Sequence, residues 1–275
     1  MTINIQCKDK VGLVAAISGL IAKEQINIIS MREHVDVEQQ LFFARLELES
    51  KEDTNLLQNK LMDVLPTDAT IKINTETEKK IVVMVTKEYH CLGDILIKNH
   101  FKSLGASVQC VIGNHEVLQE VCNKFDVPFI YISHKDKDKE TFEGEILTTL
   151  HSYSFDYLVL AKFMRILSAG FIQQYKHKII NIHHSFLPAF IGANPYRQAF
   201  ERGVKLIGAT AHYVTDCLDE GPIIAQQINP VNHTFSVADM MRAGKEIEKT
   251  TLSQALQLVL EDRVFVYNNK TVIFE

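Results

Sequence analysis

The chain has 275 residues, of which 46% are hydrophobic, and it carries a formal net charge of -5. That length and apolar content suffice for one large or two modest folded domains. The acidic excess lies in the first 78 residues, which hold 13 acidic and 8 basic side chains, while the remainder is neutral. Because the chain has no excess of basic side chains, its composition argues against a protein that binds nucleic acid.

The cysteines and the hydropathy of the chain indicate the cellular compartment. The five cysteines are odd in number and scattered, and no Cys-x-x-Cys pair occurs. This pattern favours reduced thiols in a cytoplasmic protein over a disulfide framework or a structural zinc site. There is neither a basic-then-apolar leader nor an apolar run of about 20 residues, so neither export nor membrane spanning is predicted.

The first 78 residues predict a small α/β domain. Helices are predicted after the turn at Asp9–Gly12 and from Asp53 to Val64. Strands are predicted over residues 2–7, 26–31, 41–48 and 70–73. The order βαββαβ is that of a ferredoxin-like sandwich. The polar run Thr75–Lys80 is interpreted as a linker, which divides the chain into domains 1–78 and 79–275.

This order, with Asp9-x-x-Gly12-Leu13 at the first strand-to-helix turn and Asn27 opening the second strand, resembles an ACT domain. ACT domains commonly pair through sheet edges or helices and bind small ligands, often amino acids, at that interface. The resemblance implies a homo-oligomer in which Asp9, Gly12 and Asn27 help to bind an amino-acid effector. The alternative is that Gly12 only permits a tight turn and Asn27 only caps it.

From residue 81 onward, strands alternate with helices. Residues 81–86 are predicted to form a strand that is apolar up to Val85, as expected in a parallel sheet covered on both faces. Further strands are predicted over residues 106–112, 127–133, 156–161 and 178–182, with helices between them. This spacing predicts a doubly wound, mostly parallel sheet, which is a Rossmann-like α/β domain. Ser236-x-x-Asp239 is a capping box that opens a long helix, and residues 264–274 form a closing hairpin.

Polar side chains follow two strands of this domain at the point where each strand ends. Asn181 and His183 are two residues apart and share one face of their strand, so His184 is expected to face away. Asp219 follows His212 by seven residues across an acidic loop. An amide, an imidazole and a carboxylate without a serine or cysteine nucleophile suit proton transfer at a carbonyl. A metal site is the competing interpretation, but adjacent histidines on opposite strand faces are poor joint ligands.

Three separated motifs of this domain occur in the order found in the folate-dependent formyltransferase family, which residues 80–275 resemble. The motifs are Phe163-Met164-Arg165-Ile166-Leu167, Asn181-Ile182-His183 with Ser185-x-Leu187-Pro188, and His212-x-Val214-x-x-x-x-Asp219-x-Gly221-Pro222. The resemblance implies 10-formyltetrahydrofolate as substrate, no further cofactor and no metal. It implies Asn181, His183 and Asp219 as catalytic residues, and it implies substrate-binding roles for Met164, Arg165, Leu167, His212 and Asp216.

The loop after the first strand of this domain bears on the reaction. Transformylases of the family that act on glycinamide ribonucleotide carry a Gly-rich phosphate loop there, whereas this chain has Lys87-Glu88-Tyr89-His90-Cys91-Leu92-Gly93-Asp94. An acidic loop with one glycine lacks the nest of backbone N–H groups that a phosphate needs. The chain, including Ala189-Phe190 and Gly192-Ala193-Asn194-Pro195-Tyr196, therefore resembles the members that hydrolyse 10-formyltetrahydrofolate to tetrahydrofolate and formate. The resemblance implies a role in balancing one-carbon pools and, as in some bacteria, in supplying formate for purine synthesis.

Other functions stay open at this point. A transferase that passes the formyl group to an amine would keep the same three residues, but it needs an acceptor site that the sequence does not reveal. A non-catalytic amino-acid sensor built on the first domain would leave those three residues unexplained. A methionyl-tRNA formyltransferase is disfavoured by the missing basic surface and by the N-terminal position of the accessory domain.

Overall fold

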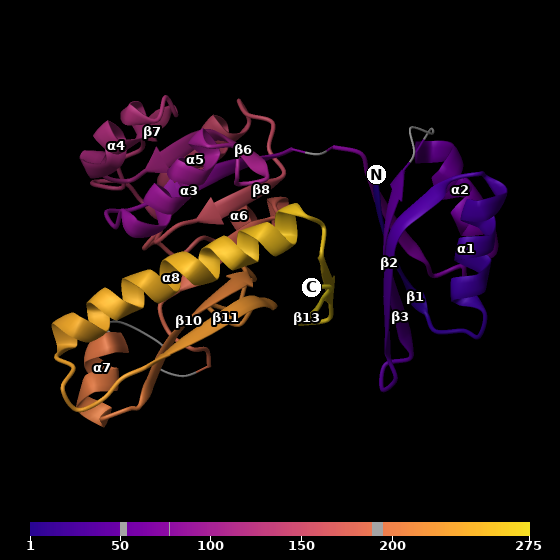
Figure 1. The fold of residues 1–275 in the computed structure, drawn as a ribbon. Coiled ribbons are helices and arrows are strands. Elements are labelled where there is room, and N and C mark those ends of the chain that lie inside the picture. Colours follow the sequence, from indigo (N-terminus) through magenta and orange to yellow (C-terminus); the bar gives the residue numbers. More distant parts are fainter. Residues whose placement is uncertain (50–53, 77, 189–194) are drawn as a thin grey trace. The chain divides into compact units, whose positions relative to one another are not determined.

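The computed structural model describes residues 1–49, 54–76, 78–188 and 195–275 (Figure 1). Its contacts divide the chain into two compact units. The first unit contains Met1–Thr77 together with Asp262–Phe265 and Val272–Glu275, and the second contains Glu78–Glu261 and Val266–Thr271. The sequence prediction placed every residue after 78 in the second domain, so the membership of the C-terminal segments in the first unit is a new feature.

The first unit is a four-stranded antiparallel sheet with two helices, which confirms the ferredoxin-like prediction. Along the chain it contains β1 (Thr2–Lys8), α1 (Leu13–Lys23), β2 (Asn27–Asp36), β3 (Leu41–Glu49), α2 (Thr54–Val64) and β4 (Thr70–Asn74). The strands lie in the order β2-β3-β1-β4. The predicted start of the second helix, Asp53, lies outside the described residues.

Alternating side chains of this sheet face the two helices. Ile3 and Ile5 of β1 share one hydrophobic core with Ile17 of α1 and Leu57 of α2, and all four side chains are fully buried. Figure 1 shows both helices against the same face of the sheet. The apolar alternation that predicted the strands is therefore the pattern that packs them.

The C-terminal residues of this unit cover the other face of the sheet. Phe43 of β3 is fully buried and meets the ring of Phe265 edge-on, with 5.6 Å between the ring centroids. The Asp262 carbonyl accepts hydrogen bonds from Asn4 Nδ2 at 2.9 Å and from Arg45 Nε at 3.1 Å. These contacts explain why β3 is buried on both faces although a two-helix sandwich would bury only one.

The second unit is built on a seven-stranded sheet in the order β11-β10-β9-β8-β5-β6-β7. Five strands are parallel: β5 (Lys79–Val85), β6 (Ala106–Gly113), β7 (Phe129–Tyr131), β8 (Tyr157–Leu160) and β9 (Ile179–His183). The remaining two, β10 (Leu206–Tyr213) and β11 (Ile223–Pro230), run antiparallel to their neighbours. The mostly parallel sheet is confirmed, and an antiparallel pair extends it beyond β9.

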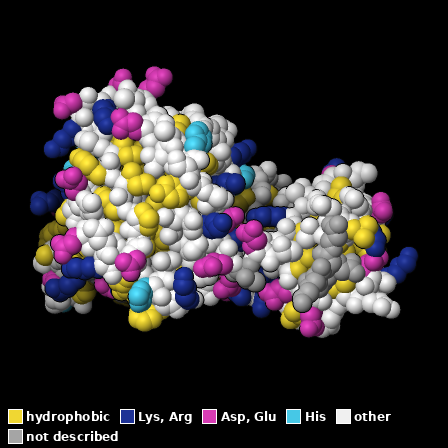
Figure 2. Space-filling view, turned by 90° about the horizontal axis from the view of Figure 1, so that it is seen from above, with side chains coloured by type: hydrophobic (Ala, Val, Ile, Leu, Met, Phe, Trp, Pro, Cys, Tyr) yellow, Lys and Arg dark blue, Asp and Glu magenta, His cyan; other side chains and the backbone are white. Residues whose placement is uncertain are grey.

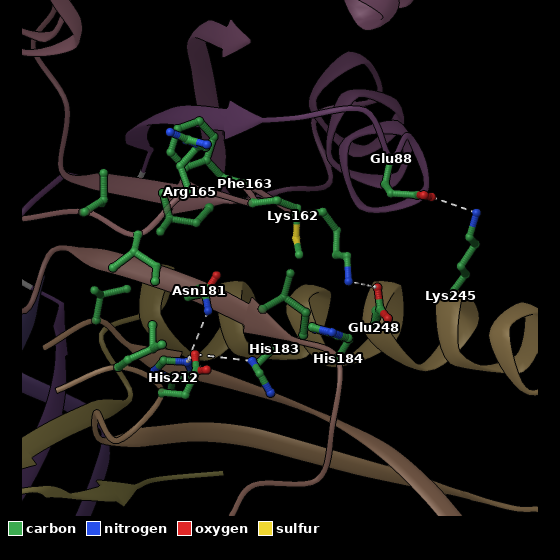
Figure 3. A pocket seen from close by; sticks show the side chains of 18 of the residues that line it. Glu88, Lys162, Phe163, Arg165, Asn181, His183, His184, His212, Lys245 and Glu248 are labelled. Carbon is green, nitrogen blue, oxygen red and sulfur yellow. Dashed lines mark hydrogen bonds and ion pairs between the residues drawn. The ribbon is translucent and has the colours of Figure 1, made fainter. Parts of the chain in front are cut away.

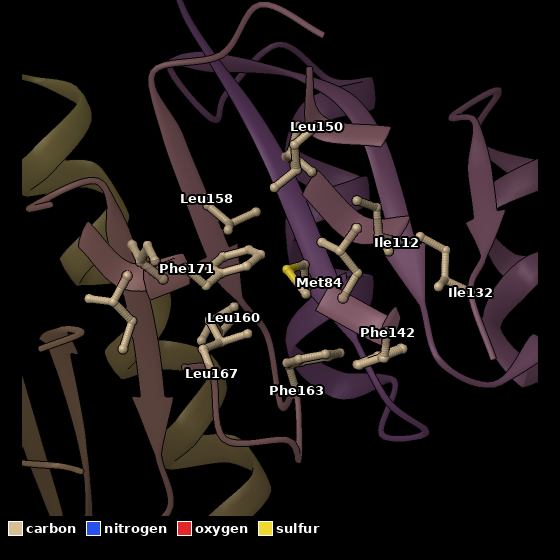
Figure 4. Packing of buried hydrophobic residues seen from close by; sticks show 14 of the residues in the cluster. Met84, Ile112, Ile132, Phe142, Leu150, Leu158, Leu160, Phe163, Leu167 and Phe171 are labelled. Carbon is tan, nitrogen blue, oxygen red and sulfur yellow. The ribbon is translucent and has the colours of Figure 1, made fainter. Parts of the chain in front are cut away.

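Helices cover this sheet on both faces. Val82 and Met84 of β5 belong to one hydrophobic core with Phe142 and Leu150, and Figure 4 shows Met84 in this core. Val83, the residue between them on the strand, is also fully buried. The helices are α3 (His90–His100), α4 (Gln119–Lys124), α5 (Lys139–Leu150), α6 (Ala169–Gln174), α7 (Pro195–Arg202) and α8 (Val237–Leu260), with a 3₁₀ turn η1 (Glu116–Leu118). The predicted capping box opens α8, and β12 (Val264–Tyr267) with β13 (Lys270–Ile273) forms the predicted hairpin. Residues 189–194, part of the sequence resemblance, are not among those described.

The surface agrees with the composition. In Figure 2, acidic and basic side chains are interspersed over the face shown, and the described residues on that face form no continuous basic patch. None of the described helices has the length and hydrophobicity that crossing a membrane requires.

Candidate active site

The polar ends of β9 and β10 meet at a cavity of about 730 Å³ in the second unit. Asn181 and His183 lie on β9, and His212 of β10 is paired directly with Asn181 across the two strands. Asp219 comes from the loop between β10 and β11. All four side chains line the cavity, and Figure 3 shows Asn181, His183 and His212 close together.

Asp219 lies between two imidazoles. Its Oδ1 is 3.3 Å from His183 Nδ1 and 3.8 Å from His212 Nε2. Burial alone would raise the pKa of this carboxyl, but the hydrogen bond from His183 and the electrostatic attraction of the neighbouring imidazoles outweigh burial and lower the pKa below its ordinary value. The carboxylate is therefore ionised at neutral pH and able to accept a proton.

The loop that carries Asp219 approaches β10 very closely. Asp219 itself has a left-handed backbone with φ 58°, which aspartate tolerates better than most residues. A Cβ added to Gly221 would lie 1.7 Å from the carbonyl oxygen of Tyr213. Only glycine fits at that point, so Gly221 holds the loop, and with it the carboxylate, against the end of β10.

His212 orients the amide of Asn181. Its Nδ1 is 2.9 Å from the carbonyl oxygen of Tyr213, so this nitrogen carries the proton and donates it. Burial lowers the pKa of His212, which keeps the ring neutral. The unprotonated Nε2 then accepts a hydrogen bond from Asn181 Nδ2 at 3.3 Å. The second N–H of the same amide group remains for a ligand.

The prediction that His184 faces away from His183 is wrong. Strand β9 ends at His183, so the alternation of side chains stops there and both rings line the cavity, with 4.8 Å between their centroids. Burial and the nearby Lys162 ammonium lower the pKa of His184 to about 4. His183 Nε2 is buried and has no hydrogen-bond partner among the described residues.

The predicted substrate-binding residues also line the cavity. They are Met164, Arg165, Leu167, His212 and Asp216. Phe163 and Leu167 are buried in the core of the second unit, whereas Met164 between them is 56% exposed. The backbone N–H of Met164 donates to Thr86 Oγ1 at 2.9 Å. This anchoring holds the segment as one wall of the cavity. Asp216, at the rim, accepts a hydrogen bond from Gln173 Nε2 at 3.1 Å.

A second polar group in the same cavity was not predicted. The Glu248 carboxylate on α8 accepts hydrogen bonds from His90 Nε2 at 2.8 Å and from the Tyr196 hydroxyl at 2.6 Å, and it lies 3.1 Å from Lys162 Nζ. Burial alone would raise the pKa of Glu248, but these three partners lower it to about 2. The sequence held one signal for this group, because Glu248 directly follows Ile247, which lies on the apolar face of the predicted long helix.

The side chains of His90, Cys91 and Glu248 bring their potential ligand atoms within 4.8 Å of one another, as a metal site requires. The Lys162 ammonium already neutralises the Glu248 carboxylate, and it would repel a cation. Burial raises the pKa of the Cys91 thiol, so a thiolate is disfavoured. These residues form an ion-paired network and do not suit a metal.

The predicted effector residues of the first unit do not meet within one chain. Asp9 and Gly12 follow the last residue of β1, and Gly12 has the left-handed φ of 94° that starts α1. Asn27 pairs with Glu49 in the register of β2 and β3, near the opposite end of β1. Its Nδ2 donates to Glu49 Oε2 at 3.3 Å.

Comparison with known proteins places both units in families. A formyl transferase model matches residues 79–256, and an ACT domain model matches residues 1–65. The chain is 48% identical over 267 residues to formyltetrahydrofolate deformylase of Escherichia coli (strain K12), covering 97% of this chain and 95% of that protein.

Solved structures show the same relationship. A formyltetrahydrofolate deformylase from Pseudomonas syringae pv. tomato has 39% identity and a TM-score of 0.94, covering 100% of this chain and 94% of that chain. Glycinamide ribonucleotide transformylase 1 from Symbiobacterium toebii has 28% identity and a TM-score of 0.69, and the match covers 73% of this chain and 96% of that chain. Because the deformylase matches span both units from end to end, the chain belongs to the formyltetrahydrofolate deformylase family.

Proposed function

We propose that this protein hydrolyses 10-formyltetrahydrofolate to tetrahydrofolate and formate. The observation that carries the proposal is the convergence of Asn181, His183 and the ionised Asp219 at one cavity. None of the described residues that line it is a serine or cysteine, so the chemistry suits attack by water and not formation of an acyl-enzyme. The E. coli relative is named for this activity.

Each side chain has a role that follows from its partners. A water molecule attacks the formyl carbon and gives a proton to the free oxygen of Asp219. The formyl oxygen becomes an oxyanion, which the spare N–H of Asn181 and an N–H at His183 Nε2 stabilise. The bond between the formyl carbon and N10 then breaks, N10 takes up the proton that Asp219 accepted from water, and tetrahydrofolate leaves with formic acid, which ionises to formate. His212 acts as a positioning residue because it is bonded to Asn181.

The pterin is assigned to the wall formed by Phe163–Leu167. Phe163 and Leu167 fix this segment in the core, so Met164 and the main chain beside it face the cavity as a rigid surface. Main-chain groups there can read the hydrogen-bonding edge of the pterin. Arg165 and Asp216, both exposed at the rim, are assigned to the more polar parts of the folate.

The direct test is to incubate the purified protein with 10-formyltetrahydrofolate and no amine, and to measure formate and tetrahydrofolate. Hydrolysis predicts equal amounts of the two products. If tetrahydrofolate appears only after an amine is added, the protein is a transferase and the proposed hydrolysis is wrong.

The ACT unit is proposed to bind an amino acid between two copies of the chain. Asp9 and Gly12 lie at one end of β1 and Asn27 lies near the other, so a site that uses all three needs a second copy. Glycine and methionine are the candidates, to be titrated by calorimetry and by activity with the oligomeric state followed by sedimentation. Binding of neither amino acid, or binding to a monomer, would contradict this assignment.

The reaction is assigned to the cytoplasm, where formate can enter purine synthesis and the folate pool is balanced. Cys7, Cys91, Cys110 and Cys122 are buried free thiols, and Cys217 is an exposed one. Unpaired cysteines are typical of reducing compartments, which supports this assignment.

A further inference from the structure

One side of the cavity takes no part in the hydrolysis described above. It is formed by Glu248 with its three partners His90, Lys162 and Tyr196, which we call the Glu248 network. The Glu248 side chain is 2% exposed and the Lys162 side chain 9% exposed. A charged pair this well buried is expensive to desolvate, so its presence calls for an explanation.

Lys162 is held in an unfavourable backbone conformation. Its φ is 63°, in the left-handed region where glycine is favoured and a long side chain is strained. This residue directly precedes the Phe163–Leu167 wall, and its ammonium reaches the Glu248 carboxylate inside the cavity. Backbone strain of this kind persists only where surrounding contacts hold the residue in place, and strained residues are common at functional sites.

Tyr196 is fitted to the network by a slot in α8. A Cβ added to Gly244 would lie 2.1 Å from Tyr196 Cζ and 2.2 Å from its hydroxyl oxygen. The missing side chain at Gly244 therefore lets the tyrosine ring lie against the helix. From there its hydroxyl donates to Glu248 Oε1 at 2.6 Å.

The network adjoins the proposed catalytic residues. The His184 ring lies between the two groups, with its centroid 4.8 Å from that of His183 and 6.4 Å from that of Tyr196. In Figure 3, Phe163 and Arg165 lie above Asn181, whereas Lys162 and Glu248 lie to the right of it. With the pterin against Phe163–Leu167, an amine acceptor would have to approach the formyl carbon from the side of Glu248.

We propose that the Glu248 network, and Lys162 above all, makes the enzyme a hydrolase by filling the acceptor side of the cavity. This inference rests on the proposed deformylase function. An amine would have to displace an ammonium from a buried carboxylate, whereas water needs no such space. The fold alone does not exclude an acceptor, since the transformylase compared above shares it.

The suppressed reaction is formyl transfer to a primary amine. The amine nitrogen would attack the formyl carbon and lose a proton to Asp219. The bond from that carbon to N10 would break, and N10 would take up a proton. The products are an N-formyl amine and tetrahydrofolate, so formation of each transfer product replaces one formate.

The test variant is Lys162→Gly. Glycine adopts a φ of 63° without strain, so the backbone is kept while the ammonium is removed. The variant is incubated with 10-formyltetrahydrofolate and glycinamide, a small primary amine, and formate and N-formylglycinamide are both quantified. We expect the ratio of transfer to hydrolysis to rise at least tenfold over that of the wild type.

A second variant and a control complete the design. Tyr196→Phe keeps the ring in its slot beside Gly244 and removes only the hydroxyl that binds Glu248, so the ratio should rise in the same direction but less. Lys249→Ala removes a lysine of α8 that pairs with Glu246 and does not line the cavity, so the ratio should stay at the wild-type value.

The outcomes separate the two proposals. A folded Lys162→Gly protein that releases formate with the wild-type ratio overturns the role of the network. Loss of both products in that folded variant also overturns it, because Lys162 would then serve the hydrolysis itself. If Lys162→Gly does not fold, Tyr196→Phe becomes the test. An unchanged ratio of transfer to hydrolysis in that variant would contradict the role proposed for the Glu248 network. Absence of formate from the wild type would instead refute the deformylase function.

Discussion

At the scale of single residues, the proposed chemistry depends on one carboxylate whose ionised form its neighbours favour. Asp219→Asn keeps the size of the side chain, and asparagine tolerates a φ of 58°, so the loop should fold. Because the proton acceptor is lost, we expect turnover to fall by about 10²–10⁴-fold. Formate release measures the change.

The matched control for that variant is Glu220→Gln, which neutralises the next carboxylate in the chain. Glu220 is exposed and does not line the cavity, so its turnover should match the wild type. If Asp219→Asn keeps turnover near the wild-type rate, the role given to Asp219 is wrong.

The residues of the site were predictable to different degrees. Asn181, His183 and Asp219 follow recognisable motifs, and the structure brings them to one cavity. His184 was misplaced because strand alternation was extended one residue past the end of β9. Lys162 was missed because a lysine is normally expected to be exposed to solvent. Its left-handed backbone and its buried partner are visible only in the folded structure.

At the scale of elements, two helix glycines should respond in opposite ways to the same change. Gly244→Ala places a methyl group against the Tyr196 ring, and overpacking of this kind destabilises by about 1–3 kcal/mol. Gly144→Ala in α5 meets nothing within 4 Å, and it should stabilise by about 0.5–1 kcal/mol because alanine is the better helix former. Urea unfolding measures both. Equal stabilisation by the two substitutions would show that Gly244 is no slot for Tyr196.

Element types were predictable, and strand directions were not. The apolar runs located β5, β6, β8 and β9 to within two residues, because buried strands leave a clear periodicity. The same pattern predicts strands at residues 207–214 and 223–228 but does not reveal their direction, so only the structure shows that β10 and β11 run antiparallel to their neighbours. The sequence predicts a helix over residues 166–174, but α6 starts at Ala169 because the side chain of Ser168 caps it by accepting from Phe171 N–H.

At the scale of the whole molecule, buried neutral histidines make stability depend on pH. Burial lowers the pKa values of His184, to about 4, and of His212. Between an ordinary value of 6.5 and about 4, the unfolded chain binds more protons at His184 than the folded chain does. The stability from this residue is therefore full above pH 6.5 and is lost as the pH falls toward 4.

We expect the free energy of unfolding to drop on acidification, with His184 contributing about 1 kcal/mol of loss by pH 5.5. Urea unfolding at pH 7.5 and 5.5 checks this. His184→Asn should reduce the pH dependence, whereas His233→Asn, at an exposed position, should leave it unchanged. An unaltered pH dependence in His184→Asn would mean that the ring is not held neutral.

The two-part organisation was predictable from the polar run near residues 75–80, but the content of the first unit was not. Phe265 and Asp262 join β1 and β3 across more than 200 positions of sequence. Neither local periodicity nor composition encodes such a pairing. The one sequence signal was Phe43, an apolar residue on the outer face of β3, which indicates that this face of the sheet is covered.

The most direct measurement of the central claim is a turnover in ¹⁸O-labelled water with 10-formyltetrahydrofolate as the only other reactant. Attack by water on the formyl carbon predicts formate with one labelled oxygen, formed in equal amount with tetrahydrofolate, and near-complete loss of both in Asp219→Asn. Unlabelled formate, or tetrahydrofolate formed only when an amine is added, would contradict the account.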